Sequence, residues 1–229
     1  LRPDDPLRTL CNGMVANLGE LDYELYHSTQ PTHLVAIENT SPPSMIVGEG
    51  LIKRTVVKEQ RFALGRAIKM LFDGSFLPVL LGAKELARLV AAVVQPFHPG
   101  CPAVTYPAAS LEDLPKRVAK AVPRKNRKQI EDLMHDRAPD LARLPDYEAY
   151  LRGVRYAADR FGLLMCNDLP QAIMHMIRSI PELRDQRLNS TEEIAAALSR
   201  HTGICELLRF AVSEEYFRLR AKLKFSIVS

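Results

Sequence analysis

One stretch, residues 58–73 (KEQRFALGRAIKMLFD), constrains the fold of this chain more than any other. Apolar side chains recur in and beside it at helical spacing, and they would cover most of a helix's circumference rather than one narrow stripe. These side chains are Val57, Ala63, Leu64, Ala67, Ile68, Met70 and Leu71. The stretch therefore predicts a central helix that other elements surround.

Two short segments before this helix have the character of β-strands. Residues 33–38 (HLVAIE) are rich in β-branched side chains and partly alternate, and residues 45–47 form a second β-prone run. Ser41, Pro42 and Pro43 lie between them and indicate a turn. We therefore expect a small antiparallel sheet of two or three strands that leads through Gly48 and Gly50 into the central helix.

Helical patterns occupy most of the remaining sequence. Residues 7–25 carry an imperfect helical pattern, so residues 1–30 are expected to form an N-terminal helical segment. Further helices are predicted over residues 83–95, up to residue 121 with Ser110 and Asp113 as a cap, from Pro123, over 147–165 and 168–179, and after Ser190 and Ser213. The predicted fold class is α+β and mainly α-helical.

Length and composition indicate a single cytosolic domain. The chain has 229 residues, of which 47% are hydrophobic and 25% charged, the usual balance for a globular protein. It has no apolar run near the roughly 18 residues that span a bilayer, and residues 1–10 do not resemble a signal peptide. Residues 1–229 are thus expected to form one domain, and the missing initial Met suggests a fragment of a longer protein.

The cysteines and the charge place few further limits on function. The four cysteines, Cys11, Cys101, Cys166 and Cys205, are widely spaced and form no CxxC pair, which favours reduced thiols over a disulfide scaffold. The formal net charge of +4 does not require an anionic partner.

Residues 64–70 carry the first of two similarities to a known family. Leu64 and Gly65 are followed by Arg66, Ala67, Ile68, Lys69 and Met70. The segment resembles the central helix of zinc metallopeptidases of the HtpX and CAAX-prenyl-protease type, where Leu-Gly often precedes His-Glu-x-x-His. By this resemblance Arg66 replaces the first zinc-binding His, Ala67 the general base and Met70 the second His.

The second similarity lies in residues 150–166 (YLRGVRYAADRFGLLMC). The same family carries Glu-x-x-x-Asp on a later helix, commonly followed by Arg-x-Gly, and the Glu is the third zinc ligand. Here Arg155 takes the place of that Glu, whereas Asp159, Arg160 and Gly162 are retained. Together with the C-terminal FAVSEEYFRLRAKL, residues 34–229 look most like the metallopeptidase-like domain found behind tetratricopeptide repeats in large bacterial proteins, notably from myxobacteria.

The resemblance implies a site that has lost its chemistry. Zinc hydrolysis needs about three protein ligands and a base. A guanidinium cannot bind zinc, an alanine cannot take a proton, and a thioether suits zinc poorly. We therefore expect no metal, no cofactor and no catalysis, and we expect Arg66 and Asp159 to form an ion pair that Arg155 also approaches. The implied role is a binding, scaffold or regulatory module, with a peptide held as an added strand on the sheet edge.

Two other functions stay open. An active hydrolase with unrecognised ligands would draw on His98 and Cys101, which share one loop, or on His135, His175 and His201. A nucleic-acid-binding module would use the densest basic cluster of the chain, for which a solvated helix face is the simpler explanation. That cluster consists of Lys116, Arg117, Lys120, Arg124, Lys125, Arg127 and Lys128.

Overall fold

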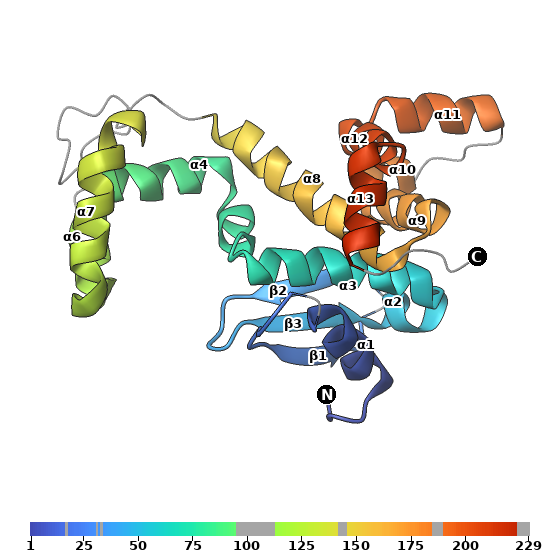
Figure 1. Cartoon of the computed structure of the whole chain (residues 1–229), viewed down its shortest axis with the longest axis horizontal. Coiled ribbons are helices and arrows are strands. Elements are labelled where there is room, and N and C mark those ends of the chain that lie inside the picture. The colour runs from blue at the N-terminus through green and yellow to red at the C-terminus, as the bar shows by residue number, and fades with distance from the viewer. Residues whose placement is uncertain are drawn as a thin grey trace. The chain divides into compact units, whose positions relative to one another are not determined.

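The computed structural model describes residues 1–16, 18–30, 32, 34–94, 113–141, 146–184 and 190–223. The chain divides into two compact units, the first formed by Leu1–Leu77 with Gly153–Ser229 and the second by Pro78–Arg152. Most of the described residues are helical, and the strands form one small sheet (Figure 1). The predicted fold class, α+β and mainly helical, is confirmed.

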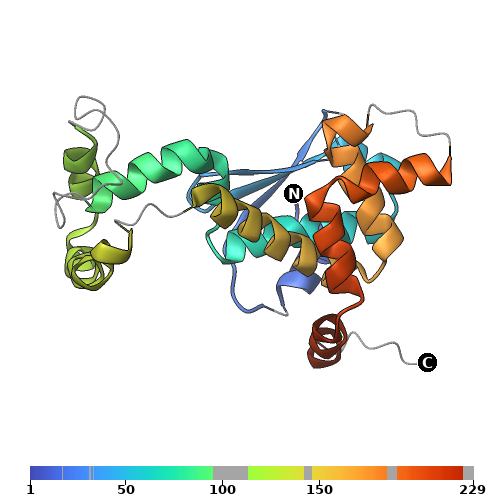
Figure 2. The ribbon, with the colours of Figure 1, turned by 90° about the horizontal axis from the view of Figure 1, so that it is seen from above.

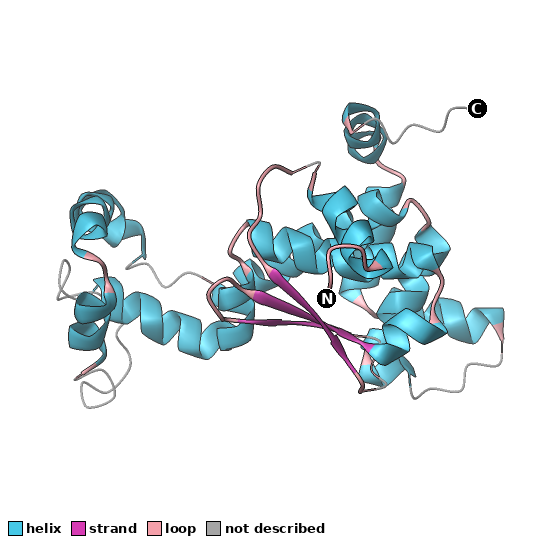
Figure 3. Ribbon diagram, turned by 90° about the horizontal axis from the view of Figure 1, so that it is seen from below, coloured by secondary structure: helices cyan, strands magenta, loops and turns pink. Residues whose placement is uncertain are grey.

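The sheet of the first unit has three strands in the order β1-β3-β2 (Figure 3). These strands are β1 (Glu24–Ser28), β2 (Val35–Glu38) and β3 (Ser44–Gly48). β2 and β3 are antiparallel, as expected for strands joined by the turn at Pro42 and Pro43, but β1 runs parallel to β3. The sheet is therefore mixed, and the prediction of a purely antiparallel sheet is wrong for β1.

The N-terminal helix is shorter than the sequence pattern suggested. α1 (Pro6–Val15) begins at the cap Asp5, whose carboxylate accepts from the Leu7 amide. Gly19 has a φ of 117°, a left-handed conformation that a helix cannot continue through. Leu25, expected at the end of the helix, lies instead in β1, where its side chain is fully buried. The burial of β1 in the sheet explains the apolar residues that extended the helical pattern.

α3 (Val57–Phe72) is the central helix that residues 58–73 predicted. It packs against α1, β2 and α9, and Phe62, Leu64 and Ile68 are fully buried. Fully buried Leu25, Met45 and Val47 of the sheet belong to the same apolar core. The short α2 (Glu49–Arg54), which was not predicted, leads from β3 into α3.

The rest of the first unit is helical. Its helices are the part of α8 (Tyr147–Cys166) from residue 153 on, α9 (Leu169–Ser179), α10 (Pro181–Arg184), α11 (Thr191–Ser199), α12 (Thr202–Ala211) and α13 (Glu214–Lys222). Ser190 and Ser213 cap α11 and α13 through their side chains, as predicted, and Asp168, predicted as the first residue of a helix, caps α9. α12 was missed because its cap is His201, whose ring nitrogen accepts from the Ile204 amide. Figure 2 shows α13, in the darkest red, following α12.

The second unit contains most of α4 (Phe76–Val94), then α6 (Leu114–Ala121), α7 (Arg124–Leu141) and the start of α8. α4 is interrupted at Gly82, which has a φ of 73°, so its longer part follows the glycine as predicted. α7 begins directly after Pro123, also as predicted. The predicted cap Ser110 lies outside the described residues. Across the described part of the chain, we find no helix with the length and apolar character to span a bilayer.

Candidate functional site

Two glycines bring α3 and α8 together in the first unit. A Cβ built on Gly65 would lie 3.1 Å from the Cα of Gly162, and one built on Gly162 would lie 2.7 Å from the Phe62 carbonyl oxygen. Real Cβ atoms do not approach a backbone oxygen so closely, so the helices can cross here only because both positions lack a side chain. The crossing sets the neighbouring residues Arg66 and Asp159 against each other.

Arg66 and Asp159 form the ion pair expected from the sequence. The Arg66 Nε lies 2.6 Å from Asp159 Oδ1, and the side chains are 25% and 6% exposed. The guanidinium carbon also lies 5.7 Å from the centre of the Phe62 ring, within range of a cation–π contact. Burial raises the pKa of Asp159, and the positive charge of Arg66 opposes that rise. The pair thus occupies the crossing of the two helices with compensating charges.

The other positions of the resemblance do not join this pair. Ala67 is only 2% exposed, and Met70 packs against the apolar core. Arg155 is exposed, and no carboxylate in the described part of the chain forms an ion pair with it. The expectation that Arg155 approaches the pair is therefore wrong, because its side chain is free to keep its charge in water.

The candidate metal ligands do not assemble among the described residues. No group of three His, Cys, Asp or Glu side chains in the described ranges is arranged to hold a metal ion. His135 is exposed, His201 caps α12, and His175 is buried beside Glu59. His98 and Cys101 lie outside the described residues.

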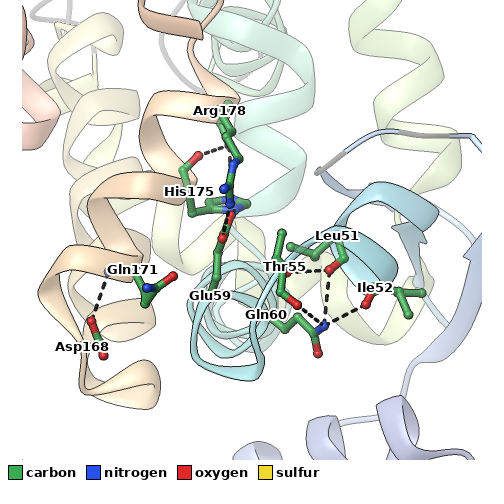
Figure 4. Close-up of polar contacts among 10 residues, drawn as sticks. Leu51, Ile52, Thr55, Glu59, Gln60, Asp168, Gln171, His175 and Arg178 are labelled. Carbon is green, nitrogen blue, oxygen red and sulfur yellow. Dashed lines mark hydrogen bonds and ion pairs between the residues drawn. The ribbon is translucent and has the colours of Figure 1, made fainter. Parts of the chain in front are cut away.

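A second buried carboxylate, that of Glu59 on α3, was not singled out from the sequence. Glu59 is 1% exposed, and Arg178 of α9 donates to its Oε2 (Figure 4). His175, one turn earlier on α9, places its Nδ1 3.7 Å from Glu59 Oε1, which is longer than a hydrogen bond. The signal in the sequence was an acidic residue inside a helix expected to be buried, because such a residue needs a partner.

The protonation states of Glu59 and His175 follow from their surroundings. Burial by itself would raise the pKa of Glu59, but the nearby His175 ring together with the hydrogen bond and positive charge of Arg178 outweighs it, so the pKa is lowered. Burial lowers the pKa of His175, although Glu59 opposes the change. The site therefore holds an ionised Glu59, a charged Arg178 and a neutral His175 at neutral pH.

A carboxylate, an imidazole and a hydroxyl lie next to one another, as in a catalytic triad, but without the geometry that catalysis requires. They belong to Glu59, His175 and Ser179. His175 Nε2 lies 3.2 Å from the Ser179 hydroxyl, which donates to the His175 carbonyl oxygen at 2.8 Å. The hydroxyl proton is thus committed to the backbone of its own helix, and the Glu59 carboxylate is held by Arg178. The arrangement binds α3 to α9 rather than activating a nucleophile.

A polar contact also fixes the entry into α3. Gln60 donates from Nε2 to the carbonyl oxygens of Leu51, Ile52 and Thr55 at 3.1 to 3.3 Å (Figure 4). These carbonyls belong to the end of α2 and the residue after it, where the helix leaves acceptors unsatisfied. Gln60 therefore holds α2, and the end of β3 before it, in a fixed position next to α3.

The outer edge of β2 carries backbone groups that do not pair with β3. The Gly48 amide donates to the Leu34 carbonyl, and Ala36 pairs with Ile46 two residues further along. In an antiparallel ladder, the residues between such hydrogen-bonded pairs direct their N–H and C=O groups away from the partner strand. Val35 and Ile37 therefore direct their backbone groups toward the outer edge of the sheet.

The seven residues of the basic cluster lie on α6 and the first half of α7, in the second unit, and all are exposed. Arg127 donates to the Val122 carbonyl oxygen. The first turn of α7 contains no acidic residue, so its cations face the positive end of the helix dipole.

Comparison with known proteins does not identify the chain: it matches no family model, no curated protein and no solved structure. The similarity to metallopeptidases therefore stays a prediction from the motifs around residues 66 and 159.

Proposed function

We propose that this chain is a catalytically inactive, peptide-binding module, and that a peptide binds by adding a strand to β2. The observation that carries the proposal is the position of β2 at the edge of the sheet, where the backbone groups of partly exposed Val35 and of buried Ile37 point away from β3. Each residue offers one amide donor and one carbonyl acceptor, so a peptide of a few residues gains several backbone hydrogen bonds there. Such binding needs an exposed strand edge and no metal.

The Arg66–Asp159 pair supports the absence of hydrolysis. By the resemblance, Arg66 stands where a zinc ligand would be, and its guanidinium is already ion-paired with the one retained carboxylate of the motif. A cation bound to that carboxylate would have to displace Arg66 from a buried contact. A metallopeptidase with the complete zinc motif would cleave a peptide held on a strand like β2, whereas this chain would bind the peptide without cleaving it.

A proline at the strand edge tests the proposal. Val35→Pro removes the outward amide, whereas Val35→Thr keeps both the amide and a β-branched side chain of similar shape. The probes are linear peptides selected against the wild-type protein from a random displayed library. We expect Val35→Pro to weaken their binding by about tenfold or more, and Val35→Thr to leave it within about twofold.

Amide spectra and mass spectrometry complete this test. Bound peptide should shift the amide resonances of Val35 and Ile37 and protect these amides from hydrogen exchange. Mass spectrometry should show that the peptide stays intact for hours after zinc is added. Equal binding by Val35→Pro and wild type would reject strand addition. Cleavage of a selected peptide in the presence of zinc would reject an inactive site.

A second candidate function follows from the basic cluster, because the cations in the first turn of α7 oppose the helix dipole and an anionic partner would relieve that repulsion. The proposed partner is a nucleic acid. A labelled duplex should bind with a steep dependence on salt that Arg124→Ala/Lys125→Ala/Lys128→Ala flattens. Arg137→Ala, which removes a cation already paired with Asp140 at 3.7 Å, is the control. Binding unaffected by the triple substitution would exclude this surface.

A further inference from the structure

The first unit contains a cavity of about 570 Å³ whose walls come from α8, α12 and α13. α8 contributes the positions 153, 156, 157, 160, 161 and 164, which recur at three- and four-residue steps along one helix face. At 1.5 Å per residue this face is roughly 16 Å long, the length of about three turns of a helix. α13 forms another wall through Glu215, Leu219 and Lys222, together with Leu223 directly after the helix. The cavity, here called the α8/α13 groove, is therefore elongated along α8.

Apolar side chains form the inner surface of the groove. Phe161, Leu164 and Phe210 are 7%, 5% and 3% exposed, so they serve as its floor. Leu219 and Leu223 pack against the core while remaining partly exposed on the wall. Gly153 lies on the α8 wall, and a Cβ built on it meets no atom within 4 Å. The groove thus offers an apolar surface with free space at the Gly153 end.

The rim of the groove carries more positive than negative charge. Lys69, Arg160 and Lys222 line it together with the carboxylate of Glu215, but Lys69 already forms an ion pair with Asp73, so Arg160 and Lys222 carry the excess. The Arg160 guanidinium lies 3.7 Å from the Glu206 carboxylate, which also accepts from Arg209, so one carboxylate serves two guanidinium groups. An occupant with negative charge beside its apolar side chains would compensate this excess.

We propose that the α8/α13 groove binds an acidic amphipathic helix of a partner protein. The length of the α8 face fits about three turns of such a helix, whose apolar side chains at i, i+3, i+4 and i+7 would contact Phe161, Leu164 and Leu219. Glutamate or aspartate residues beside that stripe would face Arg160 and Lys222. This surface is distinct from the edge of β2, so the inference does not depend on the peptide site proposed there.

The test uses a designed helix of about 14 residues, with leucine on one face and glutamate elsewhere, labelled for fluorescence anisotropy. A second peptide replaces every glutamate by lysine. We expect the acidic peptide to bind about tenfold or more tightly than the basic one, and Lys222→Glu to reduce that preference.

Two glycine substitutions separate the groove from other surfaces. Gly153→Phe places a large side chain at the open end of the groove, and we expect it to weaken the acidic peptide by about tenfold without unfolding the chain, because the position is unobstructed. Gly13→Phe is the matched control: it makes the same change on α1, where Gly13 lines a separate cavity of about 390 Å³. Val35→Pro should also leave this binding unchanged, so the two proposals can fail independently.

Three results would overturn the inference. Equal affinity for the acidic and basic peptides would contradict the charge argument. Unchanged binding of the acidic peptide by Gly153→Phe would exclude the groove as the binding site. Competition by a second copy of the chain, seen as dimerisation that Gly153→Phe abolishes, would make the groove a self-association surface instead.

Discussion

Replacing Arg66 by methionine tests most directly what the crossing of α3 and α8 requires. Methionine keeps much of the length and apolar character of the arginine stem but removes the guanidinium that lies 2.6 Å from Asp159. The substitution leaves a carboxylate that is 6% exposed without its cation. An uncompensated buried charge is among the few single-residue changes that destabilise a protein severely.

The magnitude follows from the exposure of each partner. Removing one member of a buried ion pair costs about 3–5 kcal/mol, and since Arg66 is 25% exposed the lower value, about 3 kcal/mol, applies. Asp159→Leu should cost only about 1 kcal/mol, because the long Arg66 side chain can turn its charge toward water. The double variant Arg66→Met/Asp159→Leu leaves no charge at the crossing and should also lie within about 1 kcal/mol of wild type. The predicted coupling between the two positions is therefore about 3 kcal/mol.

Urea unfolding followed by circular dichroism gives these free energies, and hydrogen exchange of the α3 amides reports the first unit by itself. The pH dependence provides a second check. The raised pKa of Asp159 means that the folded state binds its proton more tightly, so this group's contribution to stability falls as the pH rises above 3.8, the ordinary pKa of an aspartate. The loss caused by Arg66→Met should accordingly shrink toward acid pH. A cost below about 1 kcal/mol, or a larger cost for Asp159→Leu, would refute the reasoning.

Four other substitutions test further features of the structure. Gly162→Ala should destabilise the protein by about 2–3 kcal/mol in the same unfolding assay, because its Cβ would lie 2.7 Å from the Phe62 carbonyl oxygen, whereas Gly153→Ala should be neutral or stabilising by up to about 1 kcal/mol. The lowered pKa of His175 means that the unfolded state takes up a proton first, so the free energy of unfolding should fall as the pH drops below 6.5. His175→Gln should flatten this part of the pH profile. An unchanged slope would exclude His175 as its source. Ser190→Ala should cost about 1 kcal/mol by removing the side-chain acceptor for the Glu193 amide, and helix content that melts with wild-type stability would contradict the capping role.

The sequence predicted the helices well where capping residues and apolar spacing agree. Asp168, Ser190 and Ser213 each precede a helical pattern and each cap a helix, because a side-chain oxygen at that position satisfies a free amide. The strand β1 escaped detection because Leu25 continues the apolar spacing of the preceding helix. Its direction relative to β3 depends on pairing between residues about 20 positions apart, as in Glu24 with Ser44, which no local pattern encodes.

For the candidate site, the motif comparison gave the correct pairing of Arg66 with Asp159 but the wrong position for Arg155. The pairing followed from the resemblance, which places positions 66 and 159 beside one site, and in the structure the close helix crossing at Gly65 and Gly162 brings these neighbours together. Arg155 lies one turn before Asp159 on α8, and helical spacing alone does not reveal that its side chain is exposed. Glu59 and Arg178 are 119 positions apart in sequence, so their contact arises only from the packing of α3 on α9.

The strand order β1-β3-β2 has a consequence for the synthesis of the chain on the ribosome. Both outer strands pair with β3, which is made last, so neither β1 nor β2 has its native partner until Gly48 has left the exit tunnel. As long as the emerged part of the chain ends before residue 44, it carries two strands with unpaired edges. The sheet should therefore form in one step, when β3 emerges and pairs with both outer strands.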